Sequence, residues 1–519
     1  MDISESIIQE LIMSRAKTLD GLARAKRKMA RKNKISLPTN ISLLKRYHEL
    51  IKKEKIKKSN TLELLLRTRP IRSLSGIVNV SVLTKPYPCP GNCLYCPQEL
   101  EIPKSYVSGE PAVERAKKLG FNPFLQVKKR IEMLKAEGHP TDKIELRIVG
   151  GTWSYYPKKY QEWFVKRCFE ACNSKKSKAR RSDLRSFQKQ NEKAEHRIVG
   201  LSVETRPDFI NKKEIDHLRK LGATLVELGV QSIYDDVLSL NKRGHGVKET
   251  IEATKLLKDA GFKVLYQIMP NLPGSNLKKD EAMFKELFSN PDFQPDLLKI
   301  YPCALLKEAP LYKFWREGKY MPYSEKELTE LLKKIKKNIP CYVRIQRITR
   351  DIPSHLIVAG PARISNLRQV LIASMKKENW SCKCIRCREI KGEYDHKERV
   401  FFLRQDYQAS QGREIFLSFE NKNRTKIYSL LRLRKTSGSK AFIREVHTYG
   451  QLIPLRKDFD LSSSPQHRGF GKKLIKEAEK IAKKEFKAKE LSVISGAGVR
   501  GYYRKLGYKL RDTYMVKKI

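Results

Sequence analysis

Between about residues 71 and 371, short apolar runs alternate with longer stretches in which apolar residues recur at helical spacing. Six of these runs predict strands: Ile77–Leu83, Ile144–Val149, Ile198–Val203, Leu225–Val230, Lys263–Met269 and Leu297–Tyr301. Helices are predicted between them, for example Val113–Leu119, Phe124–Ala136 and Lys248–Ala260. Such alternation indicates βαβ units around a parallel sheet. Because a closed TIM barrel has eight units, we expect an α/β fold with a partial TIM-like barrel.

The pattern changes near Phe401. Consecutive strand-like runs follow, including Glu414–Glu420, Lys426–Leu433 and Ala441–Tyr449, and then an amphipathic helix with Leu474, Ala478 and Ile481 on its apolar face. We therefore predict four parts: an N-terminal extension over residues 1–70, a barrel domain over 71–371, a Cys-rich linker over 372–398 and a second α/β domain over 399–519.

The charge of the chain points to a polyanionic partner. Lysine and arginine number 108 against 57 aspartate and glutamate, which gives a formal net charge of +51. Such an excess repels itself in the folded state, and nucleic acid would neutralise it. A lysine-rich proteome is the alternative, but that bias usually raises glutamate as well. Residues 1–60 carry 16 basic and 6 acidic residues, so we predict a basic, partly helical extension that contacts phosphates.

Targeting signals are not evident. No stretch approaches the roughly 18 consecutive apolar residues of a membrane span, and the N-terminus lacks the layout of a secretory signal. We expect a cytoplasmic protein without membrane association. The sequence is compatible with a homo-oligomer or with accessory subunits.

Three of the ten cysteines form the pattern Cys-x3-Cys-x2-Cys directly after the first predicted strand: Cys89, Cys93 and Cys96. Active sites of βα barrels gather at the carboxyl ends of the strands, where this loop begins. Three thiolates can bind three irons of a [4Fe–4S] cluster and leave the fourth open. An open iron can bind S-adenosylmethionine (SAM), and reduction then yields a 5′-deoxyadenosyl radical. A zinc knuckle or chance spacing is the alternative.

Polar residues and glycines also end the later strands. Gly150 and Gly151 follow the second strand, where glycines let the backbone approach a ligand closely, and in radical SAM enzymes such a turn meets the methionine part of SAM. Glu204 and Arg206 end the third strand and Gln231 ends the fourth. We predict that all five residues bind the cofactor. An ordinary tight turn and structural salt bridges are the alternatives.

A glycine motif precedes the amphipathic helix near the C-terminus, with the sequence Gln466, His467, Arg468, Gly469, Phe470 and Gly471. A strand-to-helix turn of this kind presents backbone N–H groups to a pyrophosphate. It matches the acyl-CoA signature of GNAT acetyltransferases, and the later segment Gly501–Tyr508 supports that prediction. The alternative is a glycine turn that merely opens a basic surface helix.

A second cysteine group lies in the linker: Cys382, Cys384 and Cys387. Structural zinc prefers four tetrahedral ligands, and three are local here. The candidates for the fourth ligand are His396, Cys303, Cys341 and His355. Free surface thiols are the alternative to a zinc site.

These motifs, in this order, resemble the catalytic subunit of Elongator, the tRNA uridine C5 acetyltransferase family. The resemblance runs from about Arg67 to the C-terminus. Its more specific segments are Arg72–Gly76, Cys89–Cys96, Ser202–Asp208, Arg350–Pro353, Cys382–Glu389, Ile443–Gly450 and Gln466–Gly471, and the closing stretch Gly498–Lys517 also fits. Gln267 and Cys303 depart from the residues that the family often has at those positions, His and Thr.

The resemblance implies roles for particular residues. Cys89, Cys93 and Cys96 would bind the cluster, and the wobble uridine of tRNA would be the substrate. Lys143 would face acetyl-CoA from the barrel side, with Lys143, His447 and Tyr503 as catalytic residues. The acetyl-CoA site would be made by Glu445, Val446, His447, Thr448, the motif Gln466–Gly471 and Tyr503.

We therefore expect a radical SAM domain and a GNAT domain that share one cleft, with the glycine turn facing the barrel mouth. In the expected reaction the deoxyadenosyl radical takes hydrogen from the acetyl methyl group. The carbon radical then adds to C5 of uridine, and water releases CoA to leave a carboxymethyl group. The alternatives are a GNAT protein lysine acetyltransferase with a structural iron–sulfur domain, and a tRNA-binding protein without catalysis.

Overall fold

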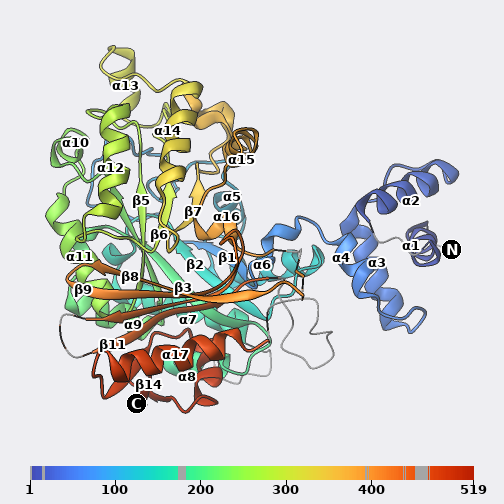
Figure 1. Ribbon diagram of the computed structural model, residues 1–519. Coiled ribbons are helices and arrows are strands. Elements are labelled where there is room, and N and C mark those ends of the chain that lie inside the picture. Colours follow the sequence, from blue (N-terminus) through green and yellow to red (C-terminus); the bar gives the residue numbers. More distant parts are fainter. Residues whose placement is uncertain are drawn as a thin grey trace.

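The computed structural model describes residues 3–14, 18–173, 183–391, 394–395, 397–436, 438, 440–450, 466 and 468–519. Within them the chain forms two seven-stranded sheets and an N-terminal group of helices (Figure 1). None of the helices in these residues is long and apolar enough to cross a membrane.

The first sheet is parallel throughout and follows chain order, β1 to β7. Strand β1 shows how it is built, since Val78 and Val80 are fully buried while Asn79 and Ser81 line the interior of the curved sheet. Strands β1 and β7 are the unpaired edges, so the expected partial barrel is confirmed. Its strands are β1 (Val78–Leu83), β2 (Lys143–Val149), β3 (Arg197–Thr205), β4 (Leu225–Gln231), β5 (Lys263–Ile268), β6 (Leu297–Ile300) and β7 (Arg344–Ile348).

Helices cover the outer face of this sheet, and their apolar residues form one core with the buried strand positions. The helices of this part are α5 (Pro111–Lys118), α6 (Pro123–Ala136), α7 (Lys158–Cys172), α8 (Leu184–Asn191), α9 (Lys212–Leu221), α10 (Asp235–Leu240), α11 (Val247–Asp259), α12 (Leu277–Ser289), α13 (Leu311–Arg316), α14 (Glu325–Asn338), α15 (Leu367–Lys377) and α16 (Ile385–Arg388).

The second sheet is mixed, with the order β13-β14-β12-β11-β10-β9-β8. Only β11 and β12 pair in parallel there, and α17 packs on β10 and β11. Its elements are β8 (Val400–Ala409), β9 (Gly412–Asn421), β10 (Ile427–Lys435), β11 (Ala441–Thr448), α17 (Phe470–Lys484), β12 (Glu490–Val493), α18 (Arg500–Arg504), β13 (Lys509–Arg511) and β14 (Tyr514–Lys518).

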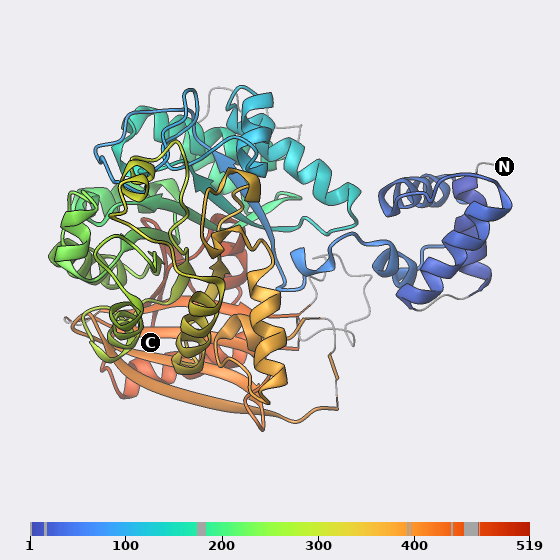
Figure 2. The ribbon, with the colours of Figure 1, turned by 90° about the horizontal axis from the view of Figure 1, so that it is seen from above.

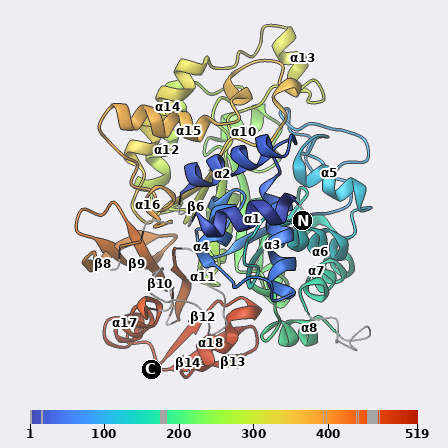
Figure 3. The same ribbon diagram turned by 90° about the vertical axis from the view of Figure 1, so that its right-hand side faces the viewer.

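Four N-terminal helices form a small bundle of their own: α1 (Ile3–Met13), α2 (Leu19–Lys32), α3 (Asn40–Lys52) and α4 (Asn60–Leu66). Ile7, Leu43 and Tyr47 lie at the centre of its apolar core. The bundle stands beside the rest of the molecule (Figure 2). Viewed from that side, it lies in front of the first sheet, between α5 and α15 (Figure 3).

The second sheet lies against the amino-terminal ends of the barrel strands. His447 on β11 contacts Ser75, which precedes β1, and Arg444 on β11 pairs with Asp296, which precedes β6. We expected the glycine turn to face the opposite, carboxyl-terminal mouth. That expectation was wrong, because buried ion pairs fix the second sheet at the amino-terminal end.

Candidate active site

A cavity of about 440 Å³ occupies the interior of the half-barrel. At the carboxyl ends of the strands it is lined by Tyr95 and Cys96 of the cysteine loop. At the other end it is lined by Glu445, His447 and Tyr449 on or just after β11. One continuous cavity therefore connects the cysteine loop with the second sheet.

The cysteine loop has the geometry of a cluster site. Three thiolates on one tetrahedral zinc would lie about 3.8 Å apart, given Zn–S bonds of about 2.3 Å. Among the described residues, Cys89, Cys93 and Cys96 do not form so close a group. Their sulfur atoms have different neighbours: Thr152 Oγ1 lies 3.9 Å from Cys89 Sγ, and Arg243 Nη1 donates to Cys93 Sγ at 3.5 Å. Separate positions of this kind suit three irons of one cubane.

Burial reinforces the need for a cation at this loop. It raises the pKa of the Cys96 thiol to about 12, so the thiolate forms only with strong positive charge beside it. The residues present therefore fit a [4Fe–4S] cluster.

The strand-end residues surround this loop. Gly150 and Gly151 adopt φ of +133° and +93°, and a Cβ on Gly150 would collide with Thr84. Arg206 donates to both carboxylate oxygens of Asp208 at 2.9 and 2.8 Å, and its guanidinium lies against Gly91 of the cysteine loop. Gln231 lines the cavity from the end of β4 with φ of +70°, a strained value for a residue with a side chain.

A charged network crosses the middle of the cavity. Lys299 Nζ lies 3.1 Å from Glu204 and also pairs with Glu227, and Gln267 donates to both carboxylates at 3.2 and 3.4 Å. Burial raises the pKa of Glu227. Burial acts the same way on Glu204, but Lys299 and the Tyr106 hydroxyl outweigh it and lower the pKa. These polar groups satisfy one another.

Strand β11 separates the cavity from the glycine turn. Successive side chains of a strand point to opposite faces, and here Glu445 and His447 line the cavity. Val446 and Thr448 face the other way, with side-chain atoms 3.7 Å from a Cβ built on Gly471. The residues expected to bind acetyl-CoA thus divide between the two faces of β11.

The turn itself has the form that pyrophosphate sites use. Gly469 adopts φ of +81°, and a Cβ there would meet no atom of the described residues within 4 Å. Phe470 begins α17 and packs on Phe419, and Arg468 lies over the ring of Tyr394. His467 lies outside the described residues.

Gln466 joins this turn to the barrel. It accepts a hydrogen bond from Lys143 Nζ at 3.0 Å and donates to the carbonyl oxygen of Thr448 at 3.2 Å. Burial lowers the pKa of Lys143 to about 8. Lys143 therefore lies where barrel and second domain meet, and it is close to its charge transition at physiological pH.

The tyrosines of α18 occupy different surroundings. Tyr503 is 6% exposed and belongs to the core of the second sheet, with its ring 5.9 Å from that of Tyr508. Its neighbour Tyr502 is 42% exposed, and its hydroxyl lies 3.2 Å from a Cβ built on Gly471. Tyr502 is thus the tyrosine at the glycine turn, and sequence reasoning missed it.

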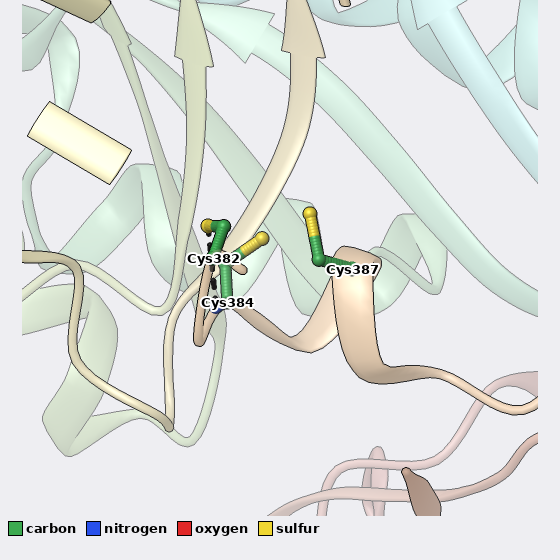
Figure 4. A group of neighbouring side chains, drawn as sticks. All are labelled: Cys382, Cys384 and Cys387. Atoms are coloured by element: carbon green, nitrogen blue, oxygen red, sulfur yellow. Dashed lines mark hydrogen bonds between the residues drawn. The ribbon is translucent and has the colours of Figure 1, made fainter. Parts of the chain in front are cut away.

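The linker cysteines come together beside β7 and α16. The sulfur atoms of Cys382, Cys384 and Cys387 lie within 4.8 Å of one another, and the three side chains are neighbours in Figure 4. Lys336, which is fully buried, donates to Cys387 Sγ at 3.5 Å. No other described His, Cys, Asp or Glu joins the group, which leaves out Cys303, Cys341 and His355. His396 lies outside the described residues.

Sequence reasoning also missed Lys299 and Arg243. Lys299 could have been recognised as a cavity residue because it is the one charged residue in the otherwise apolar strand Leu297–Ile300. A charge at such a position must face a polar interior. Arg243 lies after a helix, and no local pattern links it to Cys93.

Comparison with known proteins agrees with this architecture. The Radical SAM superfamily matches residues 87–287, and the Radical_SAM C-terminal domain matches residues 295–377. The half-barrel and its cysteine loop therefore define a Radical SAM protein, a class that implies a [4Fe–4S] cluster and SAM.

Three relatives specify the family. The tRNA uridine(34) acetyltransferase of Methanocaldococcus infernus is 46% identical, covering 93% of this chain and 92% of its own length. Elongator complex protein 3 of Homo sapiens is 39% identical, covering 88% and 86%. A solved structure, Elp3 of M. infernus with an N-terminal deletion, is 44% identical with a TM-score of 0.76, covering 86% and 100%. The chain belongs to the family of tRNA uridine(34) acetyltransferases and Elongator complex protein 3.

Proposed function

We propose that this protein modifies the wobble uridine of tRNA at C5, with SAM and acetyl-CoA as co-substrates, and leaves a carboxymethyl group. One observation carries the proposal: a single cavity is lined at one end by the cysteine loop and at the other by β11, whose opposite face lies against the glycine turn. The names of the relatives supply the substrate, and the net charge of +51 suits a polyanion.

When bound, the cluster and SAM supply a 5′-deoxyadenosyl radical, the reagent that an unactivated methyl group requires. Cys89, Cys93 and Cys96 hold the cluster, and Arg243 orients Cys93 through its hydrogen bond. Gly150 and Gly151, at φ values that a side chain would strain, form the turn at which the methionine part of SAM would bind.

Acetyl-CoA binds at the glycine turn in this proposal, with its pyrophosphate on the N–H groups of Gly469–Gly471. Lys143 supplies positive charge from the barrel side once its hydrogen bond to Gln466 is broken. His447 Nε2 donates to the Ser75 carbonyl oxygen at 2.7 Å, so Nδ1 is unprotonated. Burial lowers the pKa of His447, which keeps the ring neutral and lets Nδ1 accept a proton from the water that hydrolyses the thioester.

The linker cysteines bind zinc in the same proposal. Three sulfur atoms within 4.8 Å have the close spacing that a tetrahedral ion needs. The buried Lys336 lies beside the three sulfur atoms, which raise its pKa against the effect of burial, and its positive charge would suit a metal–thiolate centre of net negative charge.

Mass spectrometry of nucleosides tests the function. Transfer RNA is incubated with reduced enzyme, SAM and acetyl-CoA, and carboxymethyluridine is measured together with 5′-deoxyadenosine. We expect both products from the wild type, neither from Cys96→Ala, and no carboxymethyluridine from Gly471→Glu, whose carboxylate repels the pyrophosphate. Acetylation of protein lysines without 5′-deoxyadenosine would instead support a lysine acetyltransferase.

A further inference from the structure

Three carboxamide oxygens in the cavity are unpartnered. Asn79 Oδ1, Gln231 Oε1 and Gln346 Oε1 are buried and have no hydrogen-bond partner among the described residues. All three residues line the cavity. Buried polar groups nearly always have partners, so groups left without one in a cavity indicate a ligand. The central network of Glu204 and Lys299 is internally satisfied and needs none.

Gln346 has the most informative position of the three. It lies in the middle of β7, between Arg344 and Arg347, and so between the cysteine loop and β11. Because β1 and β7 do not pair, the barrel is open between these edges. The N-terminal bundle stands on this side of the sheet (Figure 3). Gln231, by contrast, lies at the strand end beside the cysteine loop, where SAM is proposed to bind.

The positive charge of Arg347 on the edge strand β7 suits the phosphates of an RNA backbone. Arg347 is paired with Asp351, but their side chains are 38% and 59% exposed. Exposed pairs of this kind contribute little, so a phosphate can replace Asp351 at small cost. A nucleotide that enters between β1 and β7 therefore meets Arg347, which can exchange Asp351 for its phosphate, and the unpartnered Oε1 of Gln346 for its base.

We propose that Gln346 is the residue that reads the uracil base, which rests on the function proposed above. Reaction at C5 requires that edge of the ring to face the reacting groups, so N3–H and a flanking carbonyl oxygen remain for recognition. A carboxamide is complementary to both, with Oε1 accepting from N3–H and Nε2 donating to the carbonyl oxygen. In this orientation of the carboxamide, Oε1 faces the acceptor at N3 of cytosine and is repelled by it.

Binding of short anticodon stem–loop RNAs to the cluster-loaded full chain tests this inference. The RNAs carry uridine, cytidine or 3-methyluridine at the wobble position, and the variants are Gln346→Leu and Gln346→Asn. We expect the wild type to prefer uridine by about tenfold or more over the other two. Both variants should lose most of that preference while retaining phosphate-dependent binding of the cytidine RNA. Gln369→Leu, on an exposed face of α15, is the control and should keep the wild-type preference.

The outcomes separate this inference from the proposed function. Full preference for uridine in both Gln346 variants would overturn the role of Gln346 and leave the function standing. If the wild type forms carboxymethyluridine but binds all three RNAs equally, the role of Gln346 is likewise overturned and the proposed function stands. If the wild type forms no carboxymethyluridine, the proposed function itself fails. A Leu variant that does not fold is replaced by the Asn variant, which shortens the side chain by one methylene and keeps its polarity.

Discussion

Burial lowers the pKa of Lys143, so the proposed binding of acetyl-CoA should depend on pH. Its folded pKa of about 8 lies below the ordinary value of 10.5. Lys143 is therefore charged below pH 8 and neutral above it, so we expect acetyl-CoA to bind up to about tenfold more weakly for each pH unit above 8. Calorimetric titration between pH 7 and 9.5 measures this. Lys143→Arg stays charged throughout and should flatten the profile; a flat wild-type profile would remove Lys143 from the CoA site.

The same lowered pKa has a consequence for stability. Between pH 8 and 10.5 the unfolded chain binds a proton at Lys143 that the folded chain does not. The contribution of this group to the free energy of unfolding therefore rises with pH across that window. Below pH 8 both states are charged, and the contribution is constant.

Single residues could be predicted from the sequence where a motif fixes their spacing. Cys89, Cys93 and Cys96 are examples, because three thiols in eight residues must share one loop. Tyr502 and Tyr503 show the limit of that reasoning. Adjacent residues in a helix differ by about 100° in direction, so only packing decides which tyrosine reaches Gly471. Contacts across long sequence separations, such as Arg243 with Cys93, leave no local pattern.

Strands could be predicted where their residues are apolar. All six predicted barrel strands are present, each within about two residues of its expected ends. The seventh, β7, was missed because its cavity side carries Arg344, Gln346 and Arg347. A strand that faces a polar cavity carries polar residues on that face. The sequence of β7 therefore resembles that of a loop, although its residues line the cavity. Strand β8 was missed for a related reason, since its alternating residues are only half-buried.

The N-terminal helices give a prediction at the scale of the element. Residues 1–66 carry 16 basic and 7 acidic residues and end with α4, so their removal deletes a whole bundle with its own core. We expect tRNA binding to weaken and its salt dependence to become shallower, by about one unit of log–log slope for each lost phosphate contact. Filter binding across a salt series measures the slope.

A charge substitution within the intact bundle controls for loss of structure. The basic residues exposed on α2 are replaced by Gln, and a matched triple replacement on α17 serves as the comparison. An equal effect of the two triples would show that the bundle contributes charge but no RNA-binding surface. The α2 variant is Arg24→Gln, Arg27→Gln and Arg31→Gln, and the α17 variant is Lys480→Gln, Lys483→Gln and Lys484→Gln.

At the scale of the whole molecule, buried ion pairs join the two sheets. Arg444 donates to both oxygens of Asp296 at 2.6 and 2.8 Å and to Glu414 at 2.9 Å, and all three side chains are fully buried. Arg432 pairs with Glu445 nearby. The alternation Leu431-Arg432-Leu433-Arg434 in β10 is typical of a strand with one face in water, and no prediction of the direction of these arginines was made from it. They face the barrel instead, which is why the placement of the second sheet could not be predicted.

Loss of Arg444 should therefore destabilise the joined molecule. Arg444→Met keeps the length of the side chain but leaves Asp296 and Glu414 with less compensating charge in a buried site. Removing one partner of a buried pair typically costs about 3–5 kcal/mol, so we expect a clearly lower thermal midpoint. Arg511→Met is the matched control, because Arg511 pairs with Glu490 on the surface and its loss should leave the midpoint unchanged.

The cavity is lined by residues of both sheets and depends on their relative position. Arg444→Met should therefore also lower carboxymethyluridine formation at temperatures where the cluster remains bound. Equal midpoints for the two variants would mean that apolar packing, and not these charges, holds the second sheet at the amino-terminal end of the barrel.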